Sequence, residues 1–403
     1  MKIAIIIALL LCGQPAMAQE KVIRIYQDAD LSNHHESSWA IQKGIEVAFA
    51  EIGNVLEGYQ IEYRYLDHRG NVVRSKNNYQ EFLEDDRALA IYSGIHSPPL
   101  ITNRTFINES KALTLVPWAA GSPVTRHPAE ENWIFRLSVD DKKAGPFIIK
   151  HAINRKRCGR PYLLLEESPW GDSNFESMSM ALEKHHIDDF NVSRFGWNIG
   201  TQGARIIIRD AKDKGSDCVV LVANAIEGSI IAQAMIEQNF NVPLISHWGI
   251  TGGNFHQQID AKKRSSLDIS FIQTCFAFTN PEQSDFSNHV FEQLNKLTQG
   301  VISSPVDLHS AVGFIHAYDL TRLLISAAKQ AGLSGDIDSD RNAIRLALED
   351  LSQPIQGLVK RYDKPYSIFR TFNNTDAHEA LDEADYCMAY FGEKDEILII
   401  PRT

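Results

Sequence analysis

The stretch VPWAAGSP, residues 116–123, follows a short apolar run and changes abruptly to small residues, two prolines and one tryptophan. The run before it, 112–116, is typical of a buried parallel strand. Small side chains at the carboxyl end of such a strand leave backbone N–H groups accessible, and open α/β sheets bind ligands at that edge. A tight turn with Trp118 packed into the core is the alternative interpretation.

Two other stretches have the same character. SGIHSPP (93–99) follows the preceding predicted strand, and SHWGITGG (246–253) follows a strand in the second half of the chain. This repetition favours a binding role for all three stretches. The sequence therefore predicts two sheets whose strand ends face one cleft.

Strands and helices alternate along most of the chain. The predicted strands of the first half are 22–27, 61–66, 88–92 and 112–116. Between the first two, apolar residues recur at helical spacing over 41–52, with Ser38 as the expected N-cap. The alternation of strands and helices restarts near Ile134. Farther along this second half, Asp172 is the expected N-cap of a helix. Such alternation indicates βαβ units with mostly parallel sheets flanked by helices.

After Ile269 the pattern changes to three helices and two short terminal strands. No helix-only domain is large enough here to stand alone, so these elements are assigned back to the two sheets. We expect an α/β fold of two lobes, joined by three chain crossings that act as a hinge. Lobe I is predicted to comprise 19–139 and 278–353, and lobe II 140–277 and 354–403.

Composition and the amino terminus limit where the protein acts. The 403 residues carry a net charge of -11 without a long basic block, which argues against nucleic acid as a partner. Residues 1–18 have a positive start, an apolar core and a small-x-small end, as in a cleaved signal peptide. We expect a periplasmic protein whose mature form does not span the membrane, because no later apolar run approaches ~20 residues.

Four cysteines remain after the expected cleavage, and they allow three disulfide pairings. Cys158 and Cys218 each begin a predicted strand of lobe II, so this pair is favoured. Cys275 and Cys387, both in extended stretches, would form the other bond. No metal is expected, because the cysteines lack CxxC spacing and have no histidine at ligand spacing.

The chain resembles the type I periplasmic binding proteins, specifically the branched-chain amino-acid-binding (Leu/Ile/Val-binding) family of ABC transporter substrate-binding proteins. IQKGIE (41–46) is similar to the family's first-helix motif, and 67–71 to its acidic turn. Phe135-Arg136 with Asp140-Asp141 resembles its first crossing between lobes, and Trp170-Gly171 its aromatic–glycine pair. These similarities follow the family's order along nearly the whole mature chain.

The resemblance implies a monomeric receptor, without enzymatic activity or cofactor, that delivers a small-molecule ligand to an ABC permease. A sensor subunit for a membrane signalling receptor remains an alternative, because fold does not decide function. An exported hydrolase is disfavoured by the lack of GxSxG, HExxH and P-loop motifs.

The resemblance also implies a set of ligand-binding residues. In lobe I the positions that hold the ligand's carboxylate correspond to Ser97, Ala119 and Gly121, with His96, Ala120 and Ser122 beside them. In lobe II the matching ligand-binding positions are Trp170, Asn224 and Trp248. His34-His35, in the loop after the first strand, are further candidates for a ligand contact. Glu166-Glu167 are interpreted as a polar strand end.

One departure from the family bears on the ligand. Its amino-acid binders have Gly-Pro-Glu-Gly, whose glutamate takes the ligand's ammonium, where this chain has Ser246-His247-Trp248-Gly249. With no acid expected there and three tryptophans at strand ends, we predict a small organic acid with an aromatic or hydrophobic body. An amino acid is the alternative ligand, and tryptophans that merely pack between the lobes are the alternative to stacking.

Overall fold

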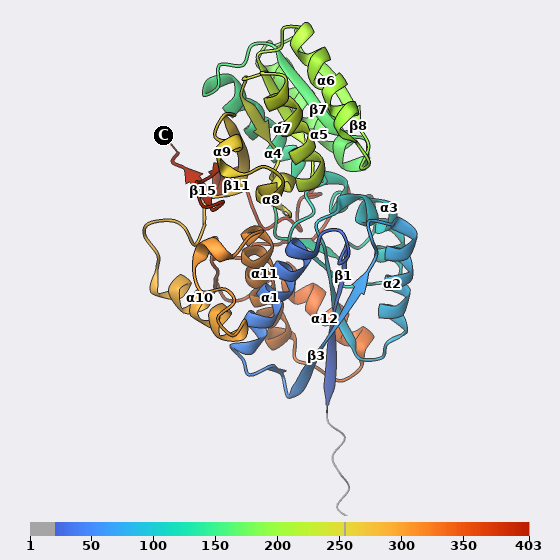
Figure 1. Ribbon diagram of the computed structural model, residues 1–403. Coiled ribbons are helices and arrows are strands. Elements are labelled where there is room, and N and C mark those ends of the chain that lie inside the picture. The colour runs from blue at the N-terminus through green and yellow to red at the C-terminus, as the bar shows by residue number, and fades with distance from the viewer. Residues whose placement is uncertain (1–20, 254, 403) are drawn as a thin grey trace, which may run out of the picture.

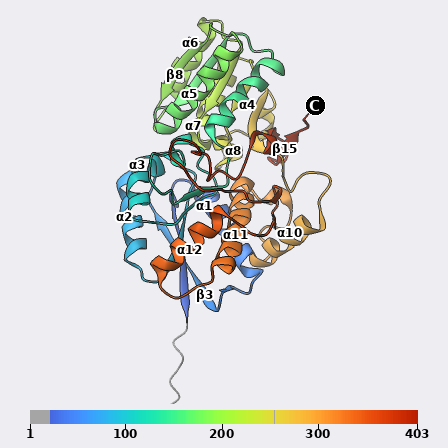
Figure 2. The same cartoon turned by 180° about the vertical axis from the view of Figure 1, so that it is seen from behind.

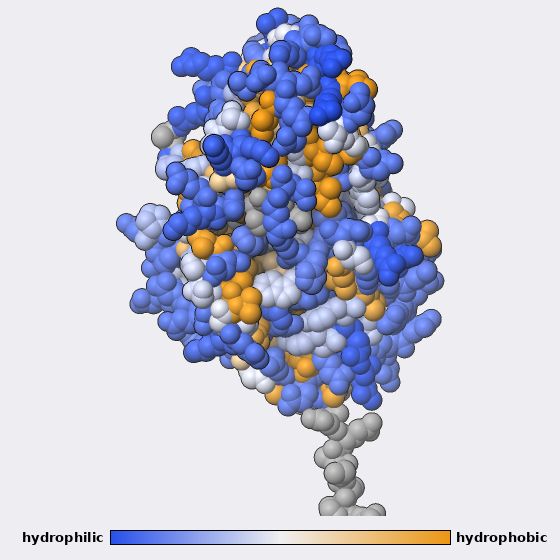
Figure 3. All heavy atoms as spheres, in the orientation of Figure 1, coloured by the Kyte–Doolittle hydropathy of each residue, from blue (hydrophilic) through white to orange (hydrophobic). Residues whose placement is uncertain are grey.

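The computed structural model describes residues 21–253 and 255–402, and the predicted signal peptide at 1–18 lies outside this part of the chain. Figures 1 and 2 show two lobes, and the described chain begins in the lower lobe and ends in the upper one. The face seen in Figure 3 is largely hydrophilic, with apolar patches separated by polar side chains. Within the described residues, no helix has both the length and the apolar character to cross a bilayer.

Lobe I contains a six-stranded sheet in the order β2-β3-β1-β4-β5-β6, parallel except for the β2–β3 pair. Its strands are β1 (Val22–Ala29), β2 (Val55–Leu56), β3 (Tyr59–Asp67), β4 (Ala88–Ser93), β5 (Thr114–Val116) and β6 (Ile134–Arg136). Its helices are α1 (His35–Ala50), α2 (Val72–Glu84), α3 (Ser97–Glu109), α10 (Asp285–Leu297), α11 (Ala311–Ala331) and α12 (Ile337–Glu349).

Both faces of this sheet are covered, as the run of buried residues in β4 requires. Tyr92 belongs to the buried cluster that includes residues of α1 and α11, and its neighbour Ile91, on the opposite face, belongs to the cluster that includes residues of α2 and α3. Gly44 lets α1 approach α11 closely, because a β-carbon there would lie 2.9 Å from the backbone nitrogen of Tyr318. The late helices therefore belong to the core of the first sheet.

Lobe II contains a seven-stranded sheet in the order β15-β14-β11-β10-β9-β7-β8, in which β14 and β15 pair antiparallel. Its strands are β7 (Pro161–Glu166), β8 (Asn191–Phe195), β9 (Cys218–Val222), β10 (Leu244–Ser246), β11 (Ile269–Thr274), β14 (Tyr386–Phe391) and β15 (Ile397–Ile400). Its helices are α4 (Asp141–Asn154), α5 (Pro169–Lys184), α6 (Thr201–Asp213), α7 (Ala225–Glu237), α8 (Phe255–Gln258) and α9 (Ala261–Arg264). The predicted two-lobed α/β fold is confirmed.

Two helix starts differ from the sequence-based prediction. Helix α1 begins at His35 with His34 at the N-cap position, a turn before the expected cap at Ser38. Ser38 is instead buried, and its hydroxyl donates to the carbonyl of Asp30 at 3.1 Å. Helix α5 begins at Pro169 after the cap Ser168 rather than after Asp172, since proline suits the first helical position.

The segment 355–380 packs on lobe I, although the sequence assigned it to lobe II. A short hairpin, β12 (Ile355–Gln356) with β13 (Arg361–Tyr362), lies against α11. Buried Asp319 of α11 accepts hydrogen bonds from the backbone nitrogens of Leu358 and Val359 and from the Tyr362 hydroxyl. A buried carboxylate needs such donors, which explains why the segment returns to the first lobe.

Two disulfide bonds lie in lobe II. Cys158 pairs with Cys218 at a Cα–Cα distance of 5.7 Å, and Cys275 pairs with Cys387 at 4.9 Å. The first bond joins the adjacent parallel strands β7 and β9 near their starts. The second joins the end of β11 to β14, which pair antiparallel. The favoured pairing is confirmed.

Candidate functional site

The carboxyl ends of the two sheets meet at the boundary between the lobes. Loops after β1, β4 and β5 carry His34, His96 and Trp118, and the matching ends in lobe II carry Glu166 and Asn224. Contacts cross this boundary directly. The Ser122 backbone nitrogen donates to the Ser173 hydroxyl at 3.1 Å, and the Ser310 hydroxyl donates to the Thr251 carbonyl at 3.1 Å. We call this boundary region the interlobe cleft.

The three predicted tryptophans come together in the cleft. The rings of Trp118 and Trp248 lie 5.9 Å apart, and Trp170 meets His247 edge-on at 5.2 Å. Trp118 and Trp248 are each only 1% exposed. In this structure these two rings pack against each other across the lobes, as the packing alternative expected.

The predicted carboxylate-binding loop has two of its backbone donors and three of its carbonyls engaged inside the protein. The backbone nitrogen of Gly121 donates to the Ser97 hydroxyl at 3.0 Å, and that of Ser122 is bonded to Ser173. The carbonyls of Ala120 and Gly121 accept from Arg136 at 3.1 and 2.9 Å, and the carbonyl of Ala119 accepts from Ser138. The loop therefore braces the boundary between the lobes in the conformation described.

Two buried glutamates lie on the lobe II side of the cleft, and from the sequence only Glu166 had been noted, as part of a polar strand end. Glu166 is completely buried at the end of β7, and it accepts hydrogen bonds from Ser168 at 2.6 Å and Asn224 at 3.1 Å. Glu227, in the first turn of α7, is 5% exposed. Burial raises the pKa of both carboxyls above its usual value. The sequence suggested no acid placed to meet an ammonium group, whereas the structure buries these two carboxyls on the lobe II side; Glu166 closes the apolar run YLLLE.

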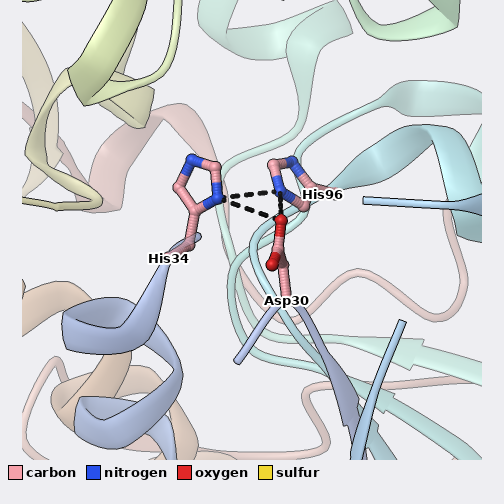
Figure 4. Close-up of side chains that lie close together, drawn as sticks. All are labelled: Asp30, His34 and His96. Atoms are coloured by element: carbon pink, nitrogen blue, oxygen red, sulfur yellow. Dashed lines mark hydrogen bonds and ion pairs between the residues drawn. The ribbon is translucent and has the colours of Figure 1, made fainter. Parts of the chain in front are cut away.

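A cluster of Asp30, His34 and His96 lies on the lobe I side of the cleft (Figure 4). His34 Nδ1 lies 3.3 Å from Asp30 Oδ2 and 3.2 Å from His96 Nε2. His96 Nε2 lies 3.5 Å from the same Asp30 oxygen. Burial lowers the pKa of His96 to about 3. His34 and His96 were both among the candidate ligand contacts, but they are 62 residues apart in the sequence, which gave no signal that they meet beside Asp30.

Several polar atoms of the cleft are buried without a hydrogen-bond partner among the described residues. They include Nε2 of His34, Nε1 of Trp170 and Oε2 of Glu227. A buried polar group without a partner costs roughly 1–3 kcal/mol, so such groups are rare unless a ligand or water completes them. These atoms come from both lobes, and a small solute between the lobes would satisfy them.

A buried histidine beside the cleft makes stability depend on pH. His316 is fully buried, and its ring nitrogens lie 3.2 Å from the Pro117 carbonyl and 3.0 Å from the Thr274 hydroxyl. A carbonyl only accepts, so Nδ1 carries the proton and Nε2 accepts from Thr274. Burial lowers the pKa of His316 to about 3.

In the unfolded chain this histidine has a pKa of about 6.5, so between that pH and the folded-state pKa only the unfolded chain binds the proton. Proton binding stabilises the unfolded chain, and the free energy of unfolding therefore decreases as the pH falls below about 6.5. We expect His316 to contribute about 2 kcal/mol to the loss of unfolding free energy between pH 7 and pH 5. Urea denaturation at both pH values measures it, and H316Q should lose that much less than the wild type. H185Q, at an exposed position, should behave as the wild type. An equal loss in H316Q and wild type would contradict the assignment.

A separate cavity lies outside the interlobe cleft. It measures about 790 Å³ and lies between α4 and the C-terminal strands, where Phe147, His151 and Met388 line it. None of the cleft residues named above lines it. A test of where a solute binds must therefore distinguish this cavity from the interlobe cleft.

Comparisons with known proteins agree with this architecture. A family model described as "Periplasmic binding protein" matches residues 35–376. Among solved structures, a periplasmic binding protein type 1 from Bordetella pertussis Tohama I is 16% identical with a TM-score of 0.76, covering 95% of this chain and 100% of that one. A search of curated proteins found no match.

Two further solved structures were obtained with ligands. LivJ from Streptococcus pneumoniae, a branched-chain amino acid transporter substrate-binding protein in complex with isoleucine, is 18% identical with a TM-score of 0.73 over 94% of this chain and 100% of that one. An ABC transporter solute-binding protein from R. palustris in complex with 4-hydroxybenzoate is 17% identical with a TM-score of 0.73 over 95% and 96%. At these identities the likeness shows a shared fold.

Proposed function

This chain belongs to the periplasmic binding protein family, and on that premise we propose that it is an exported receptor that captures a small organic solute between its lobes. Delivery of the solute to an ABC permease completes the proposal. The main support for this function is a set of buried polar atoms without a hydrogen-bond partner, on His34, Trp170 and Glu227. His34 belongs to lobe I and the other two residues to lobe II, so one solute between the lobes would contact all three.

We propose that the lobes comprise 21–139 with 278–381, and 140–277 with 382–402. The chain passes between the two sheets after β6, after β11 and before β14, and three such connections permit hinge closure around a solute. Closure buries the solute and strengthens every polar contact made to it. Binding would thus stabilise the closed form without turnover.

The buried acids indicate which solutes fit. Glu227 has a free oxygen, and Glu166 lies close enough to affect its pKa. An ammonium group placed here would form a charge-assisted hydrogen bond with Glu227. We therefore propose an amino acid with a hydrophobic or aromatic body.

A small aromatic acid is the second candidate. It is supported by the aromatic rings of the cleft, including the stacked pair His96 and Trp197, whose centroids are 4.9 Å apart. The R. palustris protein, crystallised with 4-hydroxybenzoate, has the same fold as this chain.

Thermal-shift and calorimetric titration with leucine, isoleucine, phenylalanine, benzoate and 4-hydroxybenzoate tests both candidates. We expect an amino acid to raise the melting temperature, and E227Q to weaken its binding about 10- to 100-fold because a charged acceptor is lost. E237Q, on the same helix but paired with Arg205 at the surface, serves as the matched control. Stabilisation by the aromatic acids alone would favour the second candidate, and full affinity in E227Q would contradict the role of Glu227.

A further inference from the structure

We propose that Asp30, His34 and His96 form a binding site for one divalent metal ion, for which zinc is the best fit. Figure 4 shows the three side chains pointing toward one another from the β1–α1 loop and from the loop after β4. One atom from each residue meets the other two at 3.2, 3.3 and 3.5 Å. Two imidazoles and one carboxylate are a ligand set that zinc binds, with a fourth position left open.

The three distances fit tetrahedral coordination. With metal–ligand bonds of about 2.0–2.1 Å, neighbouring ligand atoms of a tetrahedron lie about 3.3–3.4 Å apart. An octahedral ion with bonds of about 2.1 Å would bring adjacent ligand atoms to about 3.0 Å. The observed separations therefore match the tetrahedral edge better.

Supporting groups hold the ligands in place, as is usual around metal sites. The second carboxylate oxygen of Asp30 accepts hydrogen bonds from the backbone nitrogen of Asn33 at 2.9 Å and from its side chain at 3.0 Å. The other oxygen, Oδ2, faces the histidines and also accepts from the Asn33 side chain at 3.1 Å. The ring of His96 stacks on Trp197 of lobe II, which restricts its rotation.

The charges around the cluster also favour a cation. Asp30 with two neutral imidazoles carries a charge of −1, so a bound divalent ion leaves the site at +1. The carboxylate thus places one negative charge directly against the bound cation.

His34 takes part in both proposals through different nitrogens: Nδ1 faces the cluster, and Nε2 is the unpartnered atom proposed to meet the solute. Metal binding is therefore tested in the absence of solute. The sequence gave no sign of a metal site, because the cysteines lack histidines at ligand spacing and these three residues are not adjacent in the chain. The open fourth position would take water or a donor atom of the solute.

The test uses the mature chain, stripped with EDTA and dialysed into metal-free buffer. Calorimetric titration with Zn²⁺ and elemental analysis should give one ion per chain, and Co²⁺ should produce the visible absorption of a tetrahedral site. D30N, H34Q and H96Q should each weaken Zn²⁺ binding at least about 100-fold, in line with the loss of a ligand. H35Q, which changes the exposed neighbouring histidine, should retain wild-type affinity.

Circular dichroism of each stripped variant separates loss of the site from loss of the fold. A stripped wild type that binds no Zn²⁺ would overturn the proposal. Full affinity in folded H34Q and H96Q would also overturn it. Solute binding is measured separately, on the wild type and E227Q without Zn²⁺. Loss of metal binding would therefore not contradict the proposed capture of a solute.

Discussion

Replacement of Arg136 by methionine is expected to lower the free energy of unfolding by about 3–5 kcal/mol, because it leaves buried charges without their partner. The guanidinium is fully buried where the chain first crosses between the lobes. It forms ion pairs with Asp140 and, at 2.9 Å, with Glu379, and both carboxylates are 1% exposed. It also donates to the carbonyls of Ala120 and Gly121.

The effect of R136M depends on breaking only one side of the network. Arg126 still contacts Glu379 at 2.8 Å, but it does not replace the bonds to the loop carbonyls. Urea denaturation of the disulfide-bonded protein measures the change. R64M, which removes an exposed arginine 3.7 Å from Glu62, should change stability by less than about 0.5 kcal/mol. A loss below about 1 kcal/mol in R136M would contradict the account of the hinge.

Removal of the Cys275–Cys387 bond is expected to cost about 4–5 kcal/mol. The bond closes a loop of 112 residues, and cross-links across long loops restrict the unfolded chain most in the chain-entropy model. It also joins β11 to β14, so it fixes a late strand to the second sheet after the chain has visited the first lobe.

The double variant C275A/C387A, compared with wild type under non-reducing conditions, measures this cost. The Cys158–Cys218 bond, with a separation of 60 residues, is the internal comparison and should cost slightly less when removed. Free-thiol titration of the denatured, unreduced wild type should find no thiols on these four residues. A full count of four thiols would contradict both bonds.

The order and type of most elements were predictable, because they depend on local periodicity. Continuous apolar runs, such as those of β4 and β9, are typical of strands buried on both faces. This pattern is local and can be recognised without knowing which segments cover the strand. The strand positions in turn placed Cys158 and Cys218 near the starts of adjacent parallel strands.

Features that depend on distant partners were not predictable. His34 and His96 are separated by 62 residues, and only the β1–β4 pairing brings their loops together. Glu166 looked like a polar strand end because its partner Asn224 belongs to another strand end. The segment 355–380 returns to lobe I because of the buried Asp319, whose need for donors is invisible in a helix sequence.

A crystal structure of the protein purified without refolding, and soaked with the solute that raises its melting temperature most, tests the central claim most directly. The account predicts solute density in the interlobe cleft, in contact with Glu227 Oε2 and Trp170 Nε1. Solute density in the 790 Å³ cavity beside α4, with the cleft atoms still unpartnered, would contradict it.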